Sequence, residues 1–399
     1  MNTPEISRRR MLAGCSAASI AALVPSFSMA SSAGSVVEQP VVSGPSKTSW
    51  ASFRQDPAQQ GIAGCDFAAA PKLKWEFQSK DGWVATAAVV GNHVYAPALS
   101  GNLHCLDLKT GKEIWKYRSI ESDDPKEFAP GFKAAPLVTA DRIYVGDEDG
   151  FLHTIERASG KLLWKYETSA EIAGGVALYQ DQVLLASHDA SLYCLDSVGK
   201  QRWEFETNDR INCSPGLAGD FTFVSGCDAQ LRVIDLKNGQ ETRHVPMESY
   251  LIASPAIVGD TLYVGSHGGA VFAVNWKSGE IKWTYRGKRE LPVHASAAVW
   301  KDFVLVGGHD KNMHAIDRLT GEGRWTFSTK ARINCSAAVV DQRVFFGSAD
   351  GNIYGLGIKD GKQVWKHNAG KAINAGIAIG EGHLVAGEDD TNGRLLCFG

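Results

Sequence analysis

Short apolar runs separated by glycine-containing turns recur along most of the chain. One stretch contains the runs Ile252–Ile257, Thr261–Gly265, Val271–Val274 and Ile281–Tyr285, joined at Gly259–Asp260, His267–Gly269 and Ser278–Gly279. Gly-Asp between two apolar runs is a strong signal of a β-hairpin with a two-residue turn. The pattern therefore predicts consecutive units of four short antiparallel strands rather than helices.

A tryptophan four residues after a glycine marks each of these units. The pairs are Gly111/Trp115, Gly160/Trp164, Gly199/Trp203, Gly279/Trp283, Gly321/Trp325 and Gly361/Trp365, and Arg243 stands in the tryptophan place after Gly239. Successive steps at the tryptophan position are 49, 39, 40, 40, 42 and 40 residues, and Trp75 lies 40 residues before Trp115. Four-stranded units that repeat about every 40 residues are typical of a β-propeller.

The two ends of the repeat array complete each other. Residues 373–399 supply three strands and then stop, whereas the strand around Trp75 has no unit of its own. Pairing these segments completes one more unit and removes two exposed sheet edges. We therefore predict an all-β fold, an eight-bladed β-propeller over residues 50–399, with the N-terminal strand outermost in the closing blade. The predicted blade-docking residues are Trp75, Trp115, Trp164, Trp203, Trp283, Trp325 and Trp365, each burying its indole between neighbouring blades.

The pentapeptide Arg-Ile-Asn-Cys-Ser occurs twice, at 210–214 and 332–336. A paired metal site, a disulfide, two glycosylation sequons and a structural repeat are the alternatives. In the repeat alignment, Cys213 and Cys335 occupy a slot where other units have alanine or glycine. Three blades apart, the two residues would be separated by roughly 12 Å even at strand spacing, whereas a disulfide needs Cα atoms within about 7 Å. Both cysteines are therefore predicted to be packing residues.

The N-terminal 49 residues have the composition of a targeting segment and a linker. Ser7–Leu12 resembles a twin-arginine export signal, an apolar run follows to Val24, and small residues allow cleavage after Ala30. We expect residues 1–30 to be a signal peptide, residues 31–49 to be a flexible linker, and the mature chain to be periplasmic without a transmembrane segment. A lipid anchor at Cys15 is disfavoured because the lipobox-like tract directly follows the arginines.

Composition narrows the classes of function. The formal net charge is −3 and no long basic run exists, so the charge pattern does not indicate binding to a nucleic acid. The eight cysteines include no adjacent pair and no Cys-x-x-Cys spacing, which gives no support to a zinc ribbon or a thioredoxin-like site. No serine-hydrolase, zinc-protease, P-loop or dinucleotide motif occurs.

The turn lengths place one set of residues at a mouth of the central channel. With two-residue turns, the start of each innermost strand opposes the end of the second strand. The predicted pairs are Val84/Leu99, Lys133/Glu148, Ala173/His188, Asn212/Cys227, Ile252/His267, His294/His309, Asn334/Ala349 and Asn374/Asp389, with Arg210, Tyr250 and Arg332 just before them. Blades one and five are predicted to be mostly apolar there.

The candidate ligand-binding rim consists of the polar members of this set, namely Lys133, Glu148, Arg210, Asn212, His294, His309, Arg332, Asn334, Asn374 and Asp389. Lys133 and Glu148 are predicted to form an ion pair. Arg210 and Arg332 are predicted either to bind an anionic ligand or to be solvent-exposed side chains without a ligand. His294 and His309 are weak metal-ligand candidates because no third ligand is predicted in their blade. No metal and no catalytic residue is assigned.

The tract from Ala315 to Trp325, Ala-x-Asp-x-x-Thr-Gly-x-x-x-Trp, resembles the docking motif of propellers of the pyrroloquinoline-quinone (PQQ) type. Trp50–Pro57 is similar to the N-terminal segment of exported non-enzymatic members. That family includes quinoprotein alcohol dehydrogenases, which bind PQQ and calcium, and the outer-membrane assembly scaffold BamB, which binds a partner protein.

The resemblance implies one of two functions. The enzymes carry an adjacent-cysteine disulfide that this chain lacks, and Asp389 with Asn374 imitates only part of a calcium site. We expect a non-catalytic binding or scaffold propeller with a protein partner in the cell envelope and no cofactor. The alternatives are a PQQ-dependent dehydrogenase and a sensor of a small anionic ligand. The acidic loop 119–131 is either a docking element or a solvated excursion.

Overall fold

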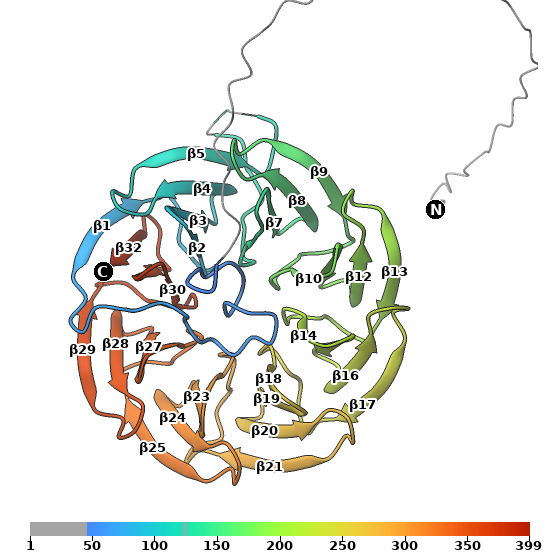
Figure 1. Ribbon diagram of the computed structural model, residues 1–399, viewed down its shortest axis with the longest axis vertical. Coiled ribbons are helices and arrows are strands. Elements are labelled where there is room, and N and C mark those ends of the chain that lie inside the picture. The colour runs from blue at the N-terminus through green and yellow to red at the C-terminus, as the bar shows by residue number, and fades with distance from the viewer. Residues whose placement is uncertain (1–45, 123, 125) are drawn as a thin grey trace, which may run out of the picture. The chain divides into compact units, whose positions relative to one another are not determined.

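The computed structural model describes residues 46–122, 124 and 126–399. Eight four-stranded antiparallel sheets stand around a central axis, and the chain colour in Figure 1 runs once around the ring. All regular structure in the described residues is β-strand. The predicted eight-bladed propeller is therefore confirmed. The predicted signal peptide and all but the last four residues of the predicted linker lie outside the described residues.

Each blade has the same order of strands from the axis outward. The innermost strands are β2 (Ala88–Val90), β6 (Leu137–Val138), β10 (Ala177–Tyr179), β14 (Gly216–Ala218), β18 (Ala256–Val258), β22 (Ala298–Trp300), β26 (Ala338–Val340) and β30 (Ala378–Gly380). The second strands are β3 (His93–Pro97), β7 (Arg142–Gly146), β11 (Gln182–Ala186), β15 (Phe221–Ser225), β19 (Thr261–Gly265), β23 (Phe303–Gly307), β27 (Arg343–Gly347) and β31 (His383–Gly387). The third strands are β4 (Asn102–Asp107), β8 (Phe151–Glu156), β12 (Ser191–Leu195), β16 (Gln230–Asp235), β20 (Ala270–Asn275), β24 (Asn312–Asp317), β28 (Asn352–Gly357) and β32 (Arg394–Phe398). The outermost strands are β5 (Glu113–Arg118), β9 (Leu162–Glu167), β13 (Gln201–Glu206), β17 (Glu241–Pro246), β21 (Ile281–Arg286), β25 (Gly323–Ser328), β29 (Gln363–Asn368) and β1 (Leu73–Gln78).

The closing blade joins the two ends of the ring as predicted. Strand β1 pairs with β32, with Trp75 opposite Cys397 and Phe77 opposite Leu395. The sheet order is β1-β32-β31-β30, so the N-terminal strand is outermost. Closure removes the edges that an open ring of sheets would expose.

The register near the channel mouth differs from the prediction. The innermost ladder of blade five covers only Ala256–Val258, whereas the apolar run predicted a strand from Ile252. Beyond this ladder the backbone pairing is shifted by two residues from the predicted register. The His267 amide donates to the carbonyl of Tyr250, whereas the predicted register would pair His267 with Ile252. The same slip occurs in all eight blades, for example from Cys227 to Arg210. A fixed two-residue turn therefore sets the register only within the regular ladder.

The docking tryptophans lie against the glycine of the following blade. A Cβ at Gly111 would come within 2.6 Å of the Trp75 ring, and Gly111 has a φ of 70°. The Trp75 Nε1 donates to the Leu108 carbonyl at 2.8 Å. Equivalent ring contacts pair Trp115, Trp164, Trp203, Trp283 and Trp325 with Gly160, Gly199, Gly239, Gly321 and Gly361. These glycines are required both by their left-handed backbone and by the indole that covers them.

The missing tryptophan of blade four is replaced from the neighbouring blade. Arg243 is exposed, and its aliphatic Cδ lies 3.3 Å from the Cβ position of Gly279. Trp276, in blade five, is buried and packs edge-on against Phe223 of blade four with ring centroids 5.4 Å apart. Its Nε1 donates to the Gly259 carbonyl at 3.0 Å. An indole from the following blade therefore supplies the buried aromatic surface at this junction.

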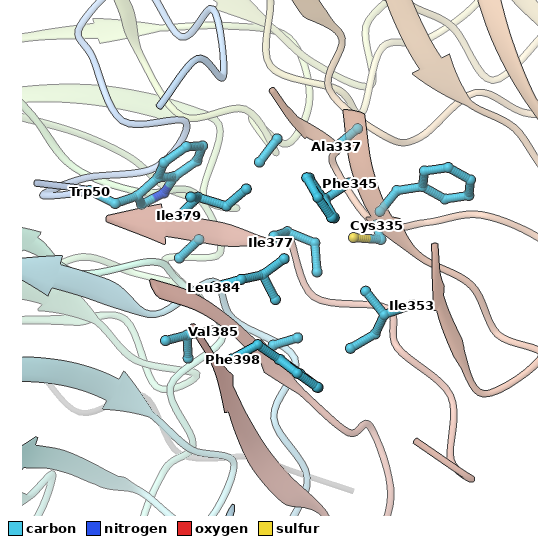
Figure 2. Close-up of a cluster of buried hydrophobic side chains, with 14 of the residues drawn as sticks. Trp50, Cys335, Ala337, Phe345, Ile353, Ile377, Ile379, Leu384, Val385 and Phe398 are labelled. Carbon is cyan, nitrogen blue, oxygen red and sulfur yellow. The ribbon is translucent and has the colours of Figure 1, made fainter. Parts of the chain in front are cut away.

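The segment before β1 runs near the centre of the ring, beside the innermost strands, as the blue trace in Figure 1 shows. Trp50 is fully buried, exchanges two backbone hydrogen bonds with Val89 and lies beside Ile379 (Figure 2). Further carbonyls of the segment, at Ala51, Pro57, Ala58, Gln60 and Gly61, accept amide hydrogens from blades two, four, five, six and seven. One extended segment thus satisfies the inner edges of six blades.

Arg54 anchors this segment without a carboxylate partner. Its side chain is buried, and its guanidinium donates to the carbonyls of Ala337 and Ala297, the latter at 3.0 Å. Burial lowers the pKa of Arg54 to about 10. Gly61 lies against the guanidinium, and its φ of 71° is left-handed. The charge is therefore held by backbone dipoles of blades six and seven.

The repeated pentapeptide serves blade packing near the axis. Ile333 fills the space left by the missing side chain of Gly307 in the preceding blade. Cys335 is fully buried, and burial raises the pKa of its thiol to about 11. Its neighbour Ser336 accepts a hydrogen bond from the Ser296 amide at 3.0 Å. The seven cysteines in the described residues are free thiols, so the prediction that Cys213 and Cys335 form no disulfide is confirmed.

Candidate functional site

The candidate rim lies where the innermost strands begin and the second strands end. Because each blade is antiparallel, these positions of all eight blades share one face of the ring. Four of the predicted side-chain pairs are in contact there despite the two-residue slip of the backbone: Lys133/Glu148, Asn212/Cys227, His294/His309 and Asn374/Asp389.

The first side-chain network spans blades two and three. The Lys133 ammonium lies 2.7 Å from Glu148 and 3.3 Å from Glu171, and His188 lies 3.7 Å from Glu171. Burial by itself would lower the pKa of Lys133, but the hydrogen bond to Glu148 and the charge of Glu171 raise it overall. Glu148 also accepts the Gly131 amide at 2.9 Å. The positive charge of Lys133 is therefore neutralised by two carboxylates of the same chain.

A second network runs around the rim from blade five to blade eight. His267 Nδ1 lies 3.0 Å from His294 Nε2, and the His294 and His309 rings meet edge-on with centroids 4.5 Å apart. His309 Nε2 donates to Asn334 Oδ1 at 2.7 Å. The array continues from Asn334 to Asn374 at 3.3 Å and from Asn374 to Asp389 at 2.8 Å. Polar groups of four blades are thus linked to one another.

The candidate rim omitted residues that complete both networks: Tyr250 and His188 were placed at the channel mouth but not in the rim, and Glu171 was not identified. Blade five was predicted to be mostly apolar at the rim, but Tyr250 stacks on His267 with centroids 4.2 Å apart and planes 22° apart. Glu171 and His188 likewise complete the first network. Tyr250 and Glu171 stand two residues before Ile252 and Ala173, the residues predicted to pair with His267 and His188, so the backbone slip explains why the alignment did not pair them.

The predicted rim arginines join neither network. Arg210 and Arg332 are exposed, and their main-chain carbonyls accept the amides of Cys227 and Ala349. Asn212 donates to the Cys227 sulfur at 3.1 Å, within its own blade. Lys133 and Lys371 are ion-paired, whereas neither guanidinium has an ion-pair partner among the described residues, so both are available to an external partner.

His294 is the most strongly shifted histidine of the rim. Burial, together with the positive charges that His309, His267 and Arg332 can carry, lowers the pKa of His294 to about 4. In the unfolded chain the imidazole takes up its proton near pH 6.5. As the pH falls from 6.5 to 4 the unfolded state binds a proton that the folded state does not, so stability is lost over this range.

We expect replacement of His294 by asparagine to reduce this acid sensitivity. The urea midpoint of the wild-type protein should fall between pH 7 and pH 4.5 by more than that of His294→Asn. The exposed His244, paired with Glu241 on an outer strand, provides the control, and His244→Asn should keep the wild-type difference. Equal losses in wild type and His294→Asn would contradict the assignment of the pH dependence to this residue.

The other side of the rim carries an acidic cavity. Asp81, Glu148, Asp389 and Asp390 line a space of about 530 Å³ together with Leu99. Lys371 lies 3.1 Å from Asp390, and Lys133 lies 2.7 Å from Glu148. The mouth is consequently acidic over blades eight to two and carries histidines and arginines over blades four to seven.

The residues present do not fit the metal that accompanies PQQ in related enzymes. Among the described residues, no group of three or more histidine, cysteine, aspartate or glutamate side chains is arranged to hold a metal ion. At the predicted partial calcium site, Asp389 accepts the amide hydrogen of Asn374, so an N–H donor occupies one carboxylate oxygen. Calcium prefers six to eight oxygen ligands.

The long connection between blades one and two is organised by one arginine. Arg118 donates to the carbonyls of Ser122, Asp124 and Glu127 at 2.6, 2.7 and 2.5 Å. Phe128 is 75% exposed at the end of this loop. The loop therefore presents an aromatic ring and acidic groups on the same face as the rim. Both interpretations from the sequence, a docking element and a solvent-exposed loop without a partner, stay open.

Comparison with known proteins identifies the family. A family model described as outer membrane protein assembly factor BamB matches residues 67–175, 148–291 and 286–396. The chain belongs to this family of PQQ-like propellers. No curated protein matches the chain by sequence.

Solved structures share the fold at low sequence identity. BamB from Moraxella catarrhalis is 16% identical with a TM-score of 0.69, and the match covers 82% of this chain and 99% of that one. The quinohemoprotein alcohol dehydrogenase from Comamonas testosteroni is 14% identical with a TM-score of 0.74, covering 88% of this chain and 80% of that one. A europium-containing methanol dehydrogenase is 12% identical with a TM-score of 0.73, covering 88% and 98%. At these identities the likeness establishes the fold alone. Among the described residues, no helix is long and apolar enough to cross a membrane.

Proposed function

We propose that this protein is an exported, non-catalytic scaffold propeller that binds a protein partner in the cell envelope through its polar rim. The observation that carries the proposal is the match to the BamB family model, which extends over residues 67–396. The rim supports it, because Lys133, Asn374 and Asp389 are engaged with neighbouring side chains, whereas Arg210 and Arg332 are exposed. The twin-arginine-like tract in residues 1–30 supports export to the periplasm.

Charge reversal at the rim tests the proposal. The mature chain is immobilised and used to capture proteins from a solubilised envelope fraction, and Arg210→Glu/Arg332→Glu is compared with wild type. We expect one envelope protein to be captured in stoichiometric amount by wild type and lost with the variant. Lys109→Glu/Lys112→Glu makes the same charge change in the β4–β5 turn on the opposite face and should retain the partner. Equal capture by all three proteins would contradict the rim as the contact surface.

An assay with PQQ distinguishes this function from the dehydrogenase alternative. The purified chain, supplied with PQQ and calcium, should develop no quinone absorbance and show no dye-linked alcohol oxidation. The physical reason is the donor set: the Asp389 carboxylate accepts a hydrogen bond from Asn374, and among the described residues it belongs to no group of three or more histidine, cysteine, aspartate or glutamate side chains arranged to hold a metal ion. Robust turnover in this assay would overturn the scaffold proposal.

A further inference from the structure

A basic cavity lies between blades five and six, outward from the rim. Its volume is about 600 Å³, within the range of small-molecule sites. The cations that line it are Arg286, Lys288, Arg289, Lys311 and Arg324. Strands β21 and β25, which carry Arg286 and Arg324, are neighbours on the outer circle of Figure 1. The cavity concentrates positive charge on a chain whose formal net charge is −3.

Only part of this charge is neutralised within the protein. Arg286 pairs with Glu248 and lies 3.3 Å from Glu290, and Arg324 pairs with Asp317. In the described part of the chain, Lys288, Arg289 and Lys311 have no carboxylate within salt-bridge distance, and all three are exposed. These three residues therefore offer cations to an external anion.

The floor of the cavity is polar but already satisfied. The Tyr285 hydroxyl lies 3.0 Å from His314 Nδ1, and His314 Nε2 lies 3.0 Å from Asp310. Tyr117, His153 and Asp147 make a similar relay between blades one and two, at 2.8 and 2.7 Å. Because the Tyr-His-Asp relay recurs at another blade junction, we assign it to blade packing. The cations that line the cavity are not part of this relay and have a separate role.

The cations depart from the repeat, and the fold does not require them. The step from Trp283 to Trp325 is 42 residues, longer than all others except the step that contains loop 119–131. The additional length lies in the connection that begins Arg286-Gly287-Lys288-Arg289. A feature needed by every blade would recur in every blade, whereas two adjacent cations follow the outermost strand only here.

Lys311 also occupies a strained backbone position. Its φ is 70°. The equivalent turn residues are glycines at Gly101, Gly150, Gly269 and Gly351 and alanines at Ala190 and Ala229, all with positive φ. A lysine in the left-handed region costs about 1–2 kcal/mol. Because Ala190 and Ala229 adopt the same conformation, this turn tolerates residues other than glycine, and Lys311 adds a cation to the cavity at that position.

We propose that this cavity binds a compact polyanion, a small molecule or headgroup that carries two or more adjacent phosphate or carboxylate groups. Three cations without an ion-pair partner in the described residues, beside two ion-paired arginines, around one cavity of about 600 Å³ suit charges that are close together. An extended acidic peptide places same-side carboxylates about 7 Å apart and would match fewer of these cations. The proposal is independent of the protein partner at the rim.

Calorimetric titration with tripolyphosphate at 0.15 M salt tests the proposal. We expect saturable binding to the mature chain and at least 10-fold weaker binding to Lys288→Gln/Arg289→Gln. Lys109→Gln/Lys112→Gln, which removes two exposed lysines from the opposite face, should bind as wild type does. Equal weakening by this control, unchanged binding by the first variant, or saturable binding of hexa-aspartate without binding of tripolyphosphate would each overturn the proposal. Vesicles with a bisphosphorylated headgroup distinguish a lipid source from a free anion.

Lys311→Gly separates a binding role from a structural one. Glycine relieves the left-handed strain, so the thermal midpoint should rise, while the loss of the cation should weaken tripolyphosphate binding several-fold. A structural lysine would instead lower the midpoint when replaced. A variant with higher stability and unchanged affinity would exclude Lys311 from the site and contradict the proposal.

Discussion

Gly61→Ala should destabilise the propeller by about 3 kcal/mol or more. A Cβ at Gly61 would overlap Nη2 of Arg54, and the φ of 71° adds strain for any residue with a side chain. Relief of the overlap requires Arg54 to leave its buried place, which breaks its hydrogen bonds to the carbonyls of Ala297 and Ala337. Each buried acceptor left without a donor costs about 1–3 kcal/mol. The free energy of unfolding in urea is the appropriate measurement.

Gly91→Ala is the matched control because Gly91 has a φ of 59° but no atom within 4 Å of its Cβ position. It should cost only the backbone strain, about 1–2 kcal/mol. In an Arg54→Ala background, Gly61→Ala should likewise cost about 1–2 kcal/mol, since the overlapping group is absent. If the cost of Gly61→Ala were the same with and without Arg54, the anchoring role of the guanidinium would be wrong.

The sequence predicted those features of the fold that repeat. The tryptophan spacing required eight blades and an N-terminal strand in the last one, and the pairing of β1 with β32 confirms this. The role of residues 50–63 was not predicted because the segment occurs once and pairs with many blades in turn. Its positive φ values at Arg54, Gln55 and Gln59 have no signature in sequence, since none of these residues is a glycine.

The candidate site was predicted in position but not in connectivity. Alignment located His294, His309, Asn334 and Asn374 correctly on one face, because all blades begin at the same end. The alignment did not predict the hydrogen bonds between these residues, because contacts between neighbouring blades depend on the direction in which each side chain points. Hydrogen bonds such as that from His309 to Asn334 link residues 25 positions apart in neighbouring blades. For the same reason, the alignment did not predict that Trp276 supplies the buried aromatic surface at the junction where Arg243 stands in the docking position.

Trp75→Ala should cost about 4 kcal/mol, the cost of truncating a well-buried tryptophan. The indole is 8% exposed, covers the backbone of Gly111 and donates to the Leu108 carbonyl at 2.8 Å. It also lies on β1, the outermost strand of the closing blade, which is held there by its ladder with β32. Loss of the indole should therefore loosen the whole strand rather than one contact.

Trp203→Ala provides the comparison, because Trp203 makes the same contacts with Gly239 and with the Leu236 carbonyl, at 3.2 Å, in a blade built from continuous chain. Both variants should lower the urea midpoint, but only Trp75→Ala should make residues 68–80 sensitive to limited proteolysis under native conditions. The reason is that β13 remains tethered through both of its flanking turns, whereas release of β1 opens the ring itself. Equal protection of residues 68–80 in both variants would show that the inner segment, anchored at Trp50 and Arg54, holds the ring closed without the outer strand.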